Sequence, residues 1–184
     1  MSLLTYNSLI RLVKDGVLEN SHTNHVNAAS IDLHLGSSLL VEKDNANGIG
    51  YVDLSKKEAP LMQRAWPDFG GNWWLEPGEF ALAETKEVFH LPDNIACEFK
   101  LKSSLARAGL NHVLAGWADP GFHNATLTLE LINCLNHNAL GLRPGMKIGQ
   151  MVFWEGEQVP SEESYAVKGR YNGQRGATES KGAV

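Results

Sequence analysis

Residues 126–131 read TLTLEL, a strict alternation of polar and apolar side chains that is typical of a half-buried β-strand. The three leucines fall on one face of such a strand, while the polar side chains share the other face with Ile132. Glu130 therefore lies in the middle of the strand. Its carboxylate is either solvated at a sheet edge or desolvated, with the raised pKa that general acid–base catalysis requires, and periodicity leaves both interpretations open.

The chain on either side of this segment is also rich in short strand patterns. Residues 31–35 alternate between apolar and polar side chains, and turn residues follow at Gly36 and at 45–48. Further strand candidates, separated by Pro, Gly and Asn residues, are 79–83, 95–101, 110–114 and 147–154. Many short strands of this spacing predict a mainly β fold, either a sandwich or a barrel.

Three segments fall outside the strand pattern. Residues 5–17 place apolar side chains near helical spacing and approach a stop signal at Gly16, which predicts a short amphipathic N-terminal helix. Residues 60–74, rich in aromatic residues and glycine, are expected to form a surface loop, a partner contact or a hydrophobic flap over the core. Residues 168–184 are polar and rich in glycine, and we expect a mobile C-terminal arm there.

The composition narrows the class of protein. A chain of 184 residues, 43% of them hydrophobic, suits one domain covering residues 1–184. Apolar runs are too short to cross a bilayer and residues 1–16 do not resemble a signal peptide, so we expect a soluble cytoplasmic protein. A net charge of -5 argues against polynucleotide binding. Cys97 and Cys134 stand alone in apolar stretches, as expected for buried free thiols.

Residues 102–107 read KSSLAR and follow a strand candidate, where we expect a short helix to start with the serines at its N-cap. The free N–H groups of such a helix start attract phosphate oxygens, and Lys102 and Arg107 would add positive charge. Taken alone, a basic helix start capped by serine is more often structural than functional.

Seven stretches resemble, in order, the motifs of dCTP deaminases, a family of the dUTPase-like superfamily. They are AASIDLHLG (28–36), LEPGEFALAET (75–85), SSLARAGL (103–110), AGWADPGF (115–122), TLE (128–130), LRPGMKIGQ (142–150) and YNGQRGATES (171–180). Any one of these motifs would be weak evidence. Together they run through nearly the whole chain, which makes the resemblance specific.

The resemblance implies a distorted β-barrel of the dUTPase-like, β-clip type that assembles as a homotrimer with active sites between subunits. It implies deamination of dCTP to dUTP and ammonia in pyrimidine deoxynucleotide metabolism, with Glu130 as the proton shuttle. Ser103, Arg107 and the backbone carbonyl of Ala115 would place the attacking water. The full set of implied substrate-binding positions is Lys102, Ser103, Ser104, Arg107, Asp119, Thr128, Leu129, Glu130, Tyr165, Arg170 and Gln174.

The implied chemistry needs no metal at the reaction centre. Zinc deaminases carry a His or Cys ligand followed by Glu, and then a PCxxC pair, and this sequence has neither. A carboxylate must then deprotonate the water that attacks C4 of cytosine and protonate N3 and the departing ammonia, a role that suits Glu130. The family resemblance implies Mg²⁺ bound through the triphosphate, with no zinc. His22, His25 and His34 lack clear ligand spacing and evident partners that would orient their rings, so we expect no metal triad among them.

Two alternative functions stay open. A dUTPase shares the implied fold and uses an aspartate in the position of Asp119 to activate water against the α-phosphate, although the tail GQRGATES (173–180) lacks the phenylalanine that stacks on uracil. A bifunctional enzyme that forms dUMP and pyrophosphate from dCTP is therefore the main alternative. For the deaminase interpretation, dUTP or dTTP is expected as a product or a possible inhibitor. The other alternative is a non-enzymatic trimer that binds nucleotide and regulates a partner through Trp66, Trp73 and Trp74.

Two positions depart from the family pattern. One extra residue stands within 123–125, between Asp119 and Glu130, where we expect a lengthened turn because the strand alternation is preserved. Lys102 stands where bacterial relatives often carry arginine, which retains the positive charge but gives up a bidentate phosphate contact. Arg107, if it lies near Glu130, would oppose an upward shift of the pKa of that carboxyl.

Overall fold

The alternating segment forms the middle of a long strand, β10 (His123–Asn133), in the computed structural model of the chain, which describes residues 1–44 and 50–182. The leucine face of this strand is buried, with Leu127 7%, Leu129 2% and Leu131 0% exposed. The predicted strand and its core-facing side are thus confirmed. The turn predicted at 45–48 lies outside the described residues.

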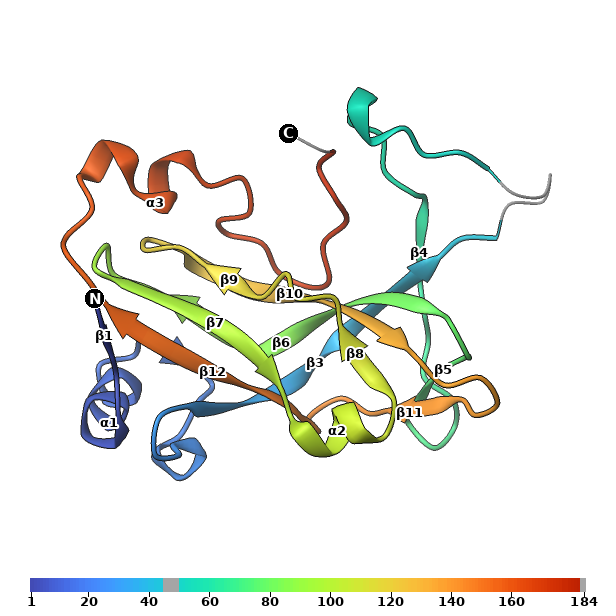
Figure 1. Cartoon of the computed structure of the whole chain (residues 1–184), viewed down its shortest axis with the longest axis horizontal. Coiled ribbons are helices and arrows are strands. Elements are labelled where there is room, and N and C mark those ends of the chain that lie inside the picture. The colour runs from blue at the N-terminus through green and yellow to red at the C-terminus, as the bar shows by residue number, and fades with distance from the viewer. Residues whose placement is uncertain (45–49, 183–184) are drawn as a thin grey trace.

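A curled antiparallel sheet contains β10 and forms the body of the molecule (Figure 1). Its strand order is β8–β10–β6–β3–β12–β7–β9. The other strands on this path are β3 (Ile31–Glu42), β6 (Phe80–His90), β7 (Ile95–Leu101), β8 (Leu110–His112), β9 (Trp117–Ala118) and β12 (Lys147–Glu155). The mainly β prediction is therefore confirmed.

Short strands extend this sheet and form a second one. In the main sheet, β1 (Ser2–Leu3) pairs with β12, β2 (Leu18–Glu19) with β6, and β4 (Met62–Arg64) with β3. A separate two-stranded sheet joins β5 (Trp73–Leu75) to β11 (Leu140–Leu142). The buried leucine, isoleucine and phenylalanine side chains of these strands make up one hydrophobic core.

The helices are short and lie at the edges of the sheet (Figure 1). The predicted N-terminal helix is α1 (Tyr6–Lys14), which buries Leu9 and Leu12 and is followed by Gly16 at a φ of 75°, a conformation that favours glycine. The other helices are η1 (Thr23–His25), η2 (Leu54–Lys56), α2 (Ser103–Arg107), η3 (Ser161–Glu163) and α3 (Tyr165–Lys168). Among the helices of the described ranges, none is long and apolar enough to cross a membrane.

The extra residue between Asp119 and Glu130 is accommodated inside β10 and not in a longer turn. His123 pairs with His90 and Ala125 pairs with Phe89, so Asn124 is one residue too many for β6. Asn124 has a φ of 50°, a left-handed conformation that asparagine tolerates well. The predicted lengthened turn is therefore wrong, and a β-bulge takes its place.

Three other local predictions need correction. Cys97 is fully buried, and burial raises the pKa of its thiol, but Cys134 is exposed because it follows the end of β10. The strand predicted at 110–114 ends at His112, since Leu114 has a φ of 63°. Residues 60–74 are not a simple loop, because they include β4 and the start of β5.

The aromatic side chains of residues 60–74 divide between the core and the surface. Trp73 is 3% exposed and belongs to the core, whereas Trp66 is 73% exposed and Phe69 is fully exposed. The guanidinium of Arg64 lies 4.4 Å from the ring centre of Trp66, in a cation–π contact. The expectation that this segment packs over the core therefore holds for Trp73 but not for Trp66 or Phe69.

Candidate active site

A cavity of about 490 Å³ opens beside β10, between the sheet and the C-terminal segment. Most of its wall is apolar, with a few polar groups converging on it, as in many small-molecule sites. Its lining comprises Pro60, Met62, Phe80, Leu82, Ala115, Trp117, Ala118, Asp119, Phe122, Leu127, Thr128, Glu130, Tyr165, Tyr171, Gln174, Thr178, Glu179 and Ser180. Six of the predicted site residues thus meet there: Ala115, Asp119, Thr128, Glu130, Tyr165 and Gln174.

Glu130 lies on the wall of this cavity, opposite Leu82 of the neighbouring strand β6. Its side chain is partly buried, and this burial raises the pKa of the carboxyl above its ordinary value, although a backbone hydrogen bond acts in the opposite direction. The structure thus favours the desolvated interpretation over the solvated one. A raised pKa brings a carboxyl closer to the range in which it can both take up and release a proton.

Asp119 lies at the turn between β9 and β10, on the rim of the same cavity. Its Oδ1 accepts a hydrogen bond of 2.8 Å from Nε1 of Trp117, which orients the carboxylate. The turn also holds the C-terminal segment, because the backbone N–H of Tyr165 donates to a carbonyl of the turn at 3.1 Å. Gly121 is required at this contact, since it has a φ of 86° and a Cβ would lie 2.2 Å from Oγ of Ser164.

The C-terminal segment closes one side of the cavity by binding to the edge of β10. The backbone N–H of Thr126 donates to the carbonyl of Gln174 at 3.1 Å, and Nε2 of Gln174 donates to the carbonyl of Thr126 at 2.8 Å. The N–H of Thr178 donates to Oγ1 of Thr128 at 3.3 Å. This segment brings Tyr171, Thr178 and Glu179 to the cavity, which sequence reasoning missed although all three lie within the motif at 171–180.

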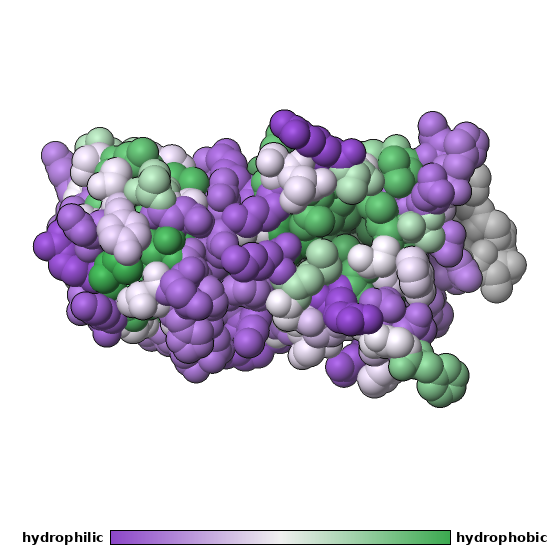
Figure 2. All heavy atoms as spheres, turned by 90° about the horizontal axis from the view of Figure 1, so that it is seen from below, coloured by the Kyte–Doolittle hydropathy of each residue, from purple (hydrophilic) through white to green (hydrophobic). Residues whose placement is uncertain are grey.

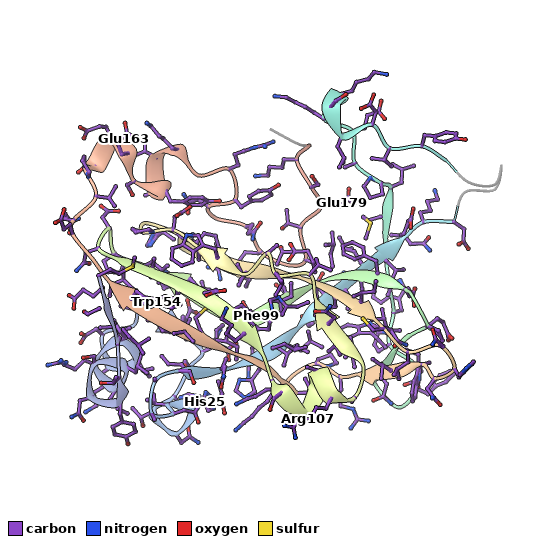
Figure 3. All side chains as sticks on the ribbon, in the orientation of Figure 1. His25, Phe99, Arg107, Trp154, Glu163 and Glu179 are labelled. Carbon is purple, nitrogen blue, oxygen red and sulfur yellow. The ribbon has the colours of Figure 1, made fainter. Side chains whose placement is uncertain are left out.

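The basic group on α2 does not join this cavity. Lys102, Ser103, Ser104 and Arg107 are absent from the described lining, and Figure 3 shows Arg107 at the lower edge of the molecule while Glu179 lies above the sheet. The predicted serine N-cap is also wrong, because α2 begins after Lys102 and no side chain caps it.

Leu129 belongs neither to the described cavity wall nor to α2. Its side chain is 2% exposed and lies in the core, so only its backbone is available to a ligand.

Lys102 is held by a buried carboxylate that the sequence did not single out. Its Nζ contacts Oδ1 of Asp32, and Nζ of Lys147 lies 2.9 Å from Oδ2 of the same residue. Burial alone would raise the pKa of Asp32, but hydrogen bonds from Lys102, Lys147 and Asn27 lower it to about 2. Asp32 therefore anchors the basic end of β7 to β3.

Arg170 lies beside the cavity and not in it. An adjoining hollow of about 580 Å³ shares Asp119, Tyr165 and Tyr171 with the cavity and adds Lys168 and Arg170. Arg170 donates to the backbone carbonyl of Lys181 at 2.6 Å and to that of Gly182 at 3.2 Å. Positive charge from this chain thus reaches the rim of the cavity near Asp119, but not its described wall.

Comparisons with known proteins point to one family. Residues 3–156 match a family model described as dCTP deaminase-like. A protein of Mycobacterium tuberculosis (strain ATCC 25177 / H37Ra) named "dCTP deaminase, dUMP-forming" is 41% identical over 160 residues, covering 85% of this chain and 82% of its own. A protein of the same name from Rhodococcus opacus (strain B4) is 40% identical over 159 residues, with the same coverage.

A solved structure shows the same fold. The 2'-deoxycytidine 5'-triphosphate deaminase from Agrobacterium tumefaciens matches with a TM-score of 0.70 at 19% identity, over 87% of this chain and 50% of that one. This chain thus spans half the length of that protein. The mainly β, barrel-like fold expected from the motifs is confirmed. With a family model matching residues 3–156 and relatives of 40–41% identity, the chain belongs to the dCTP deaminase-like family of enzymes.

Proposed function

We propose that this enzyme deaminates dCTP and carries the product on to dUMP. The net reaction consumes one dCTP and two waters and yields dUMP, ammonia and pyrophosphate. The names of the Mycobacterium tuberculosis and Rhodococcus opacus relatives, which describe them as dUMP-forming, support this end point. The bifunctional alternative therefore takes the place of the expectation that dUTP is the released product.

One observation carries the proposal: the partly buried Glu130, with its raised pKa, and Asp119 line the same cavity. In the first step Glu130 takes a proton from a water molecule, and the oxygen of that water forms a bond to C4 of cytosine. Glu130 then protonates N3, and a later proton transfer to the amino group lets the C4–N4 bond break and ammonia leave. The apolar wall favours this cycle because it keeps the carboxyl poorly solvated.

The second step requires another carboxylate, and Asp119 is placed to supply it. It lies where the cavity meets the hollow that contains Lys168 and Arg170, so phosphates that extend from the cavity into the hollow would pass it. There Asp119 would deprotonate a second water, whose oxygen forms a bond to the α-phosphorus while the bond to the bridging oxygen breaks and pyrophosphate leaves.

A second copy of the chain would complete the site. The charged residues of the described cavity wall are Asp119, Glu130 and Glu179, all acidic, whereas a triphosphate needs cations. Arg107, on α2, lies at another edge of the same chain (Figure 3), and Lys102 directly precedes this helix. Figure 2 shows an apolar area ringed by hydrophilic surface on the lower face, which is typical of contact surfaces. These features support a homotrimer in which α2 of one copy faces the cavity of the next.

Magnesium would enter this site with the triphosphate. Carboxylates such as those of Asp119 and Glu179, which line the cavity, are the oxygen donors that Mg²⁺ prefers, so the residues present fit the ion. When bound, magnesium neutralises phosphate charge. The proposed proton transfers at C4 and N3 belong to Glu130.

Chromatography of the nucleotides formed from dCTP and MgCl₂, together with an ammonia assay, tests the proposal. We expect dUMP, pyrophosphate and ammonia in equal amounts. Asp119→Asn should still release ammonia but accumulate dUTP, while the exposed control Asp44→Asn behaves as wild type. Accumulation of dUTP by the wild type would identify a plain deaminase, and a lack of ammonia would refute deamination itself.

A further inference from the structure

A cluster of metal-ligating side chains lies away from the cavity, where η1, β3 and β6 meet. It consists of His25, His34 and Glu87, and one ligand atom of each lies within 4.8 Å of the others. The ring centres of His25 and His34 are 4.6 Å apart. Figure 3 shows His25 at the lower side of the molecule, whereas Glu179 of the cavity lies above the sheet.

Glu87 is built into this cluster as a fixed partner of His34. Its side chain is 0% exposed, and a buried carboxylate is costly unless it is hydrogen-bonded. Oε2 accepts a bond of 3.0 Å from the backbone N–H of His34, and Oε1 lies 2.7 Å from Nδ1 of the same residue. A proton on Nδ1 satisfies this contact and leaves the lone pair of Nε2 free. Metal-binding histidines are commonly oriented in this way by a carboxylate behind the ring.

His25 supplies a second imidazole from a different element. Its Nδ1 accepts a long bond of 3.3 Å from the backbone N–H of His22, a weak contact that a metal ion can replace. Burial, followed by the charges that His34, His22 and Lys147 can carry, lowers the pKa of His25. The neutral ring, which is the form that binds metals, is therefore favoured.

The charges around the cluster are balanced. Lys147 opposes a cation there, but its Nζ is paired with Asp32 at 2.9 Å, and Lys102 contacts the same carboxylate. The carboxylates of Asp32 and Glu87 thus balance the two lysine ammonium groups before any ion binds. A divalent cation thus does not enter a region of excess positive charge.

We propose that His25 and His34, with Glu87 behind His34, form a binding site for a divalent transition-metal cation such as zinc. Imidazole nitrogens select zinc, nickel or copper over magnesium, so this site differs in chemistry from a magnesium–triphosphate site. A bound ion would tie η1 to β3 and stabilise the segment between them. The sequence does not reveal a carboxylate behind these histidines, because Glu87 comes from a strand more than 50 residues further on.

Zinc titration by calorimetry tests this site, using the full chain without an affinity tag, stripped with EDTA, in buffer containing MgCl₂ and no nucleotide. We expect one zinc ion per chain. His34→Asn should abolish binding, and His25→Asn should weaken it strongly. Glu87→Gln, which removes the negative charge and one of the two acceptor oxygens behind His34, should weaken zinc binding by about 10- to 100-fold.

His123→Asn is the matched control, because His123 belongs to an exposed group of similar composition. Its ring centre lies 5.0 Å from that of His90, whose Nε2 is 3.3 Å from a carboxylate oxygen of Glu19. We expect His123→Asn to bind zinc like the wild type, and circular dichroism shows which variants are folded. If Glu87→Gln does not fold, the part-exposed His25 still provides the test. The proposal is overturned if the wild-type protein binds no zinc. It is also overturned if His25→Asn and His34→Asn both retain wild-type affinity, or if only His123→Asn loses zinc.

Discussion

The cavity around Glu130 and the edge formed by α2 differ in both charge and solvation. Carboxylates make up the charged part of the described cavity wall, and burial raises the pKa of one of them, Glu130. The α2 edge presents Lys102 and the exposed Arg107, with Asp32 held ionised behind Lys102. The cavity can move protons but lacks cations for a triphosphate, while the edge has cations but no cavity. The proposed two-copy site rests on this difference, because it would bring the carboxylates of one chain to the cations of another.

The largest expected effect separates proton transfer from binding on the cavity side. Glu130→Gln removes the group that cycles protons between water, N3 and ammonia, so we expect the rate of ammonia release to fall roughly 10³-fold while dCTP still binds. A coupled ammonia assay and calorimetry with dCTP measure the two quantities. Glu157→Gln, at an exposed position, is the control. Ammonia release by Glu130→Gln at the wild-type rate would remove Glu130 from its assigned role.

A smaller effect is expected when the cover of the cavity is removed. Truncation after Val167 deletes the segment that contains Arg170 and Gln174, including the hydrogen bonds of Gln174 to β10. We expect kcat/KM for dCTP to fall at least about tenfold because the closed, positioned state is lost. Steady-state kinetics measure this, with circular dichroism to confirm the fold. An unchanged kcat/KM would show that the C-terminal arm does not close over the substrate.

On the α2 side, a stability effect is expected from Asp32. The lysines lower its pKa from 3.8 to about 2, so the stabilisation is complete above pH 3.8 and is lost as the pH falls through about 2. Asp32→Asn should therefore reduce the free energy of unfolding by about 2 kcal/mol at pH 7. Urea unfolding of both proteins and of the Asp44→Asn control measures the difference. Equal stability at pH 7 would mean that Asp32 does not anchor Lys102.

The smallest expected effect has the opposite sign. Because folding raises the pKa of Glu130, the folded state holds its proton more tightly, and the wild type loses stability as the pH rises from the unfolded pKa through the folded one. Glu130→Gln should escape this loss and be slightly more stable than the wild type at pH 8, with the two equal below pH 4. Thermal unfolding across this range gives the comparison. A wild type that gains stability relative to the variant as pH rises would contradict the raised pKa.

The strand alternation at 126–131 predicted both β10 and its buried face, because a period of two is a local property of the chain. The bulge at Asn124 was not predicted, since it depends on how many residues β6 offers opposite it. The exposure of Cys134 likewise depends on where β10 leaves the sheet. Local patterns thus predict elements and faces, whereas partner strands decide the details.

For the site, the family resemblance predicted six residues that line one cavity in the structure, including Glu130 and Asp119. The resemblance did not predict that α2 lies away from this cavity. A motif gives the order of residues in the sequence and not the distance between strands of a curled sheet. Asp32 and Glu87 were missed for the same reason, since each acts through partners from distant elements. Contacts of this kind follow from the fold and not from the spacing of residues.

Mixing two inactive variants tests most directly whether the carboxylate and the cations come from different copies. Glu130→Gln keeps the α2 edge and Arg107→Ala keeps the cavity, so each homotrimer should be inactive while co-expressed chains form mixed trimers. We predict that the mixture releases ammonia from dCTP at roughly a quarter of the wild-type rate, because random assembly pairs an intact cavity with an intact edge at about one site in four. If the co-expressed variants stay as inactive as either alone, both halves belong to one chain and the account is contradicted.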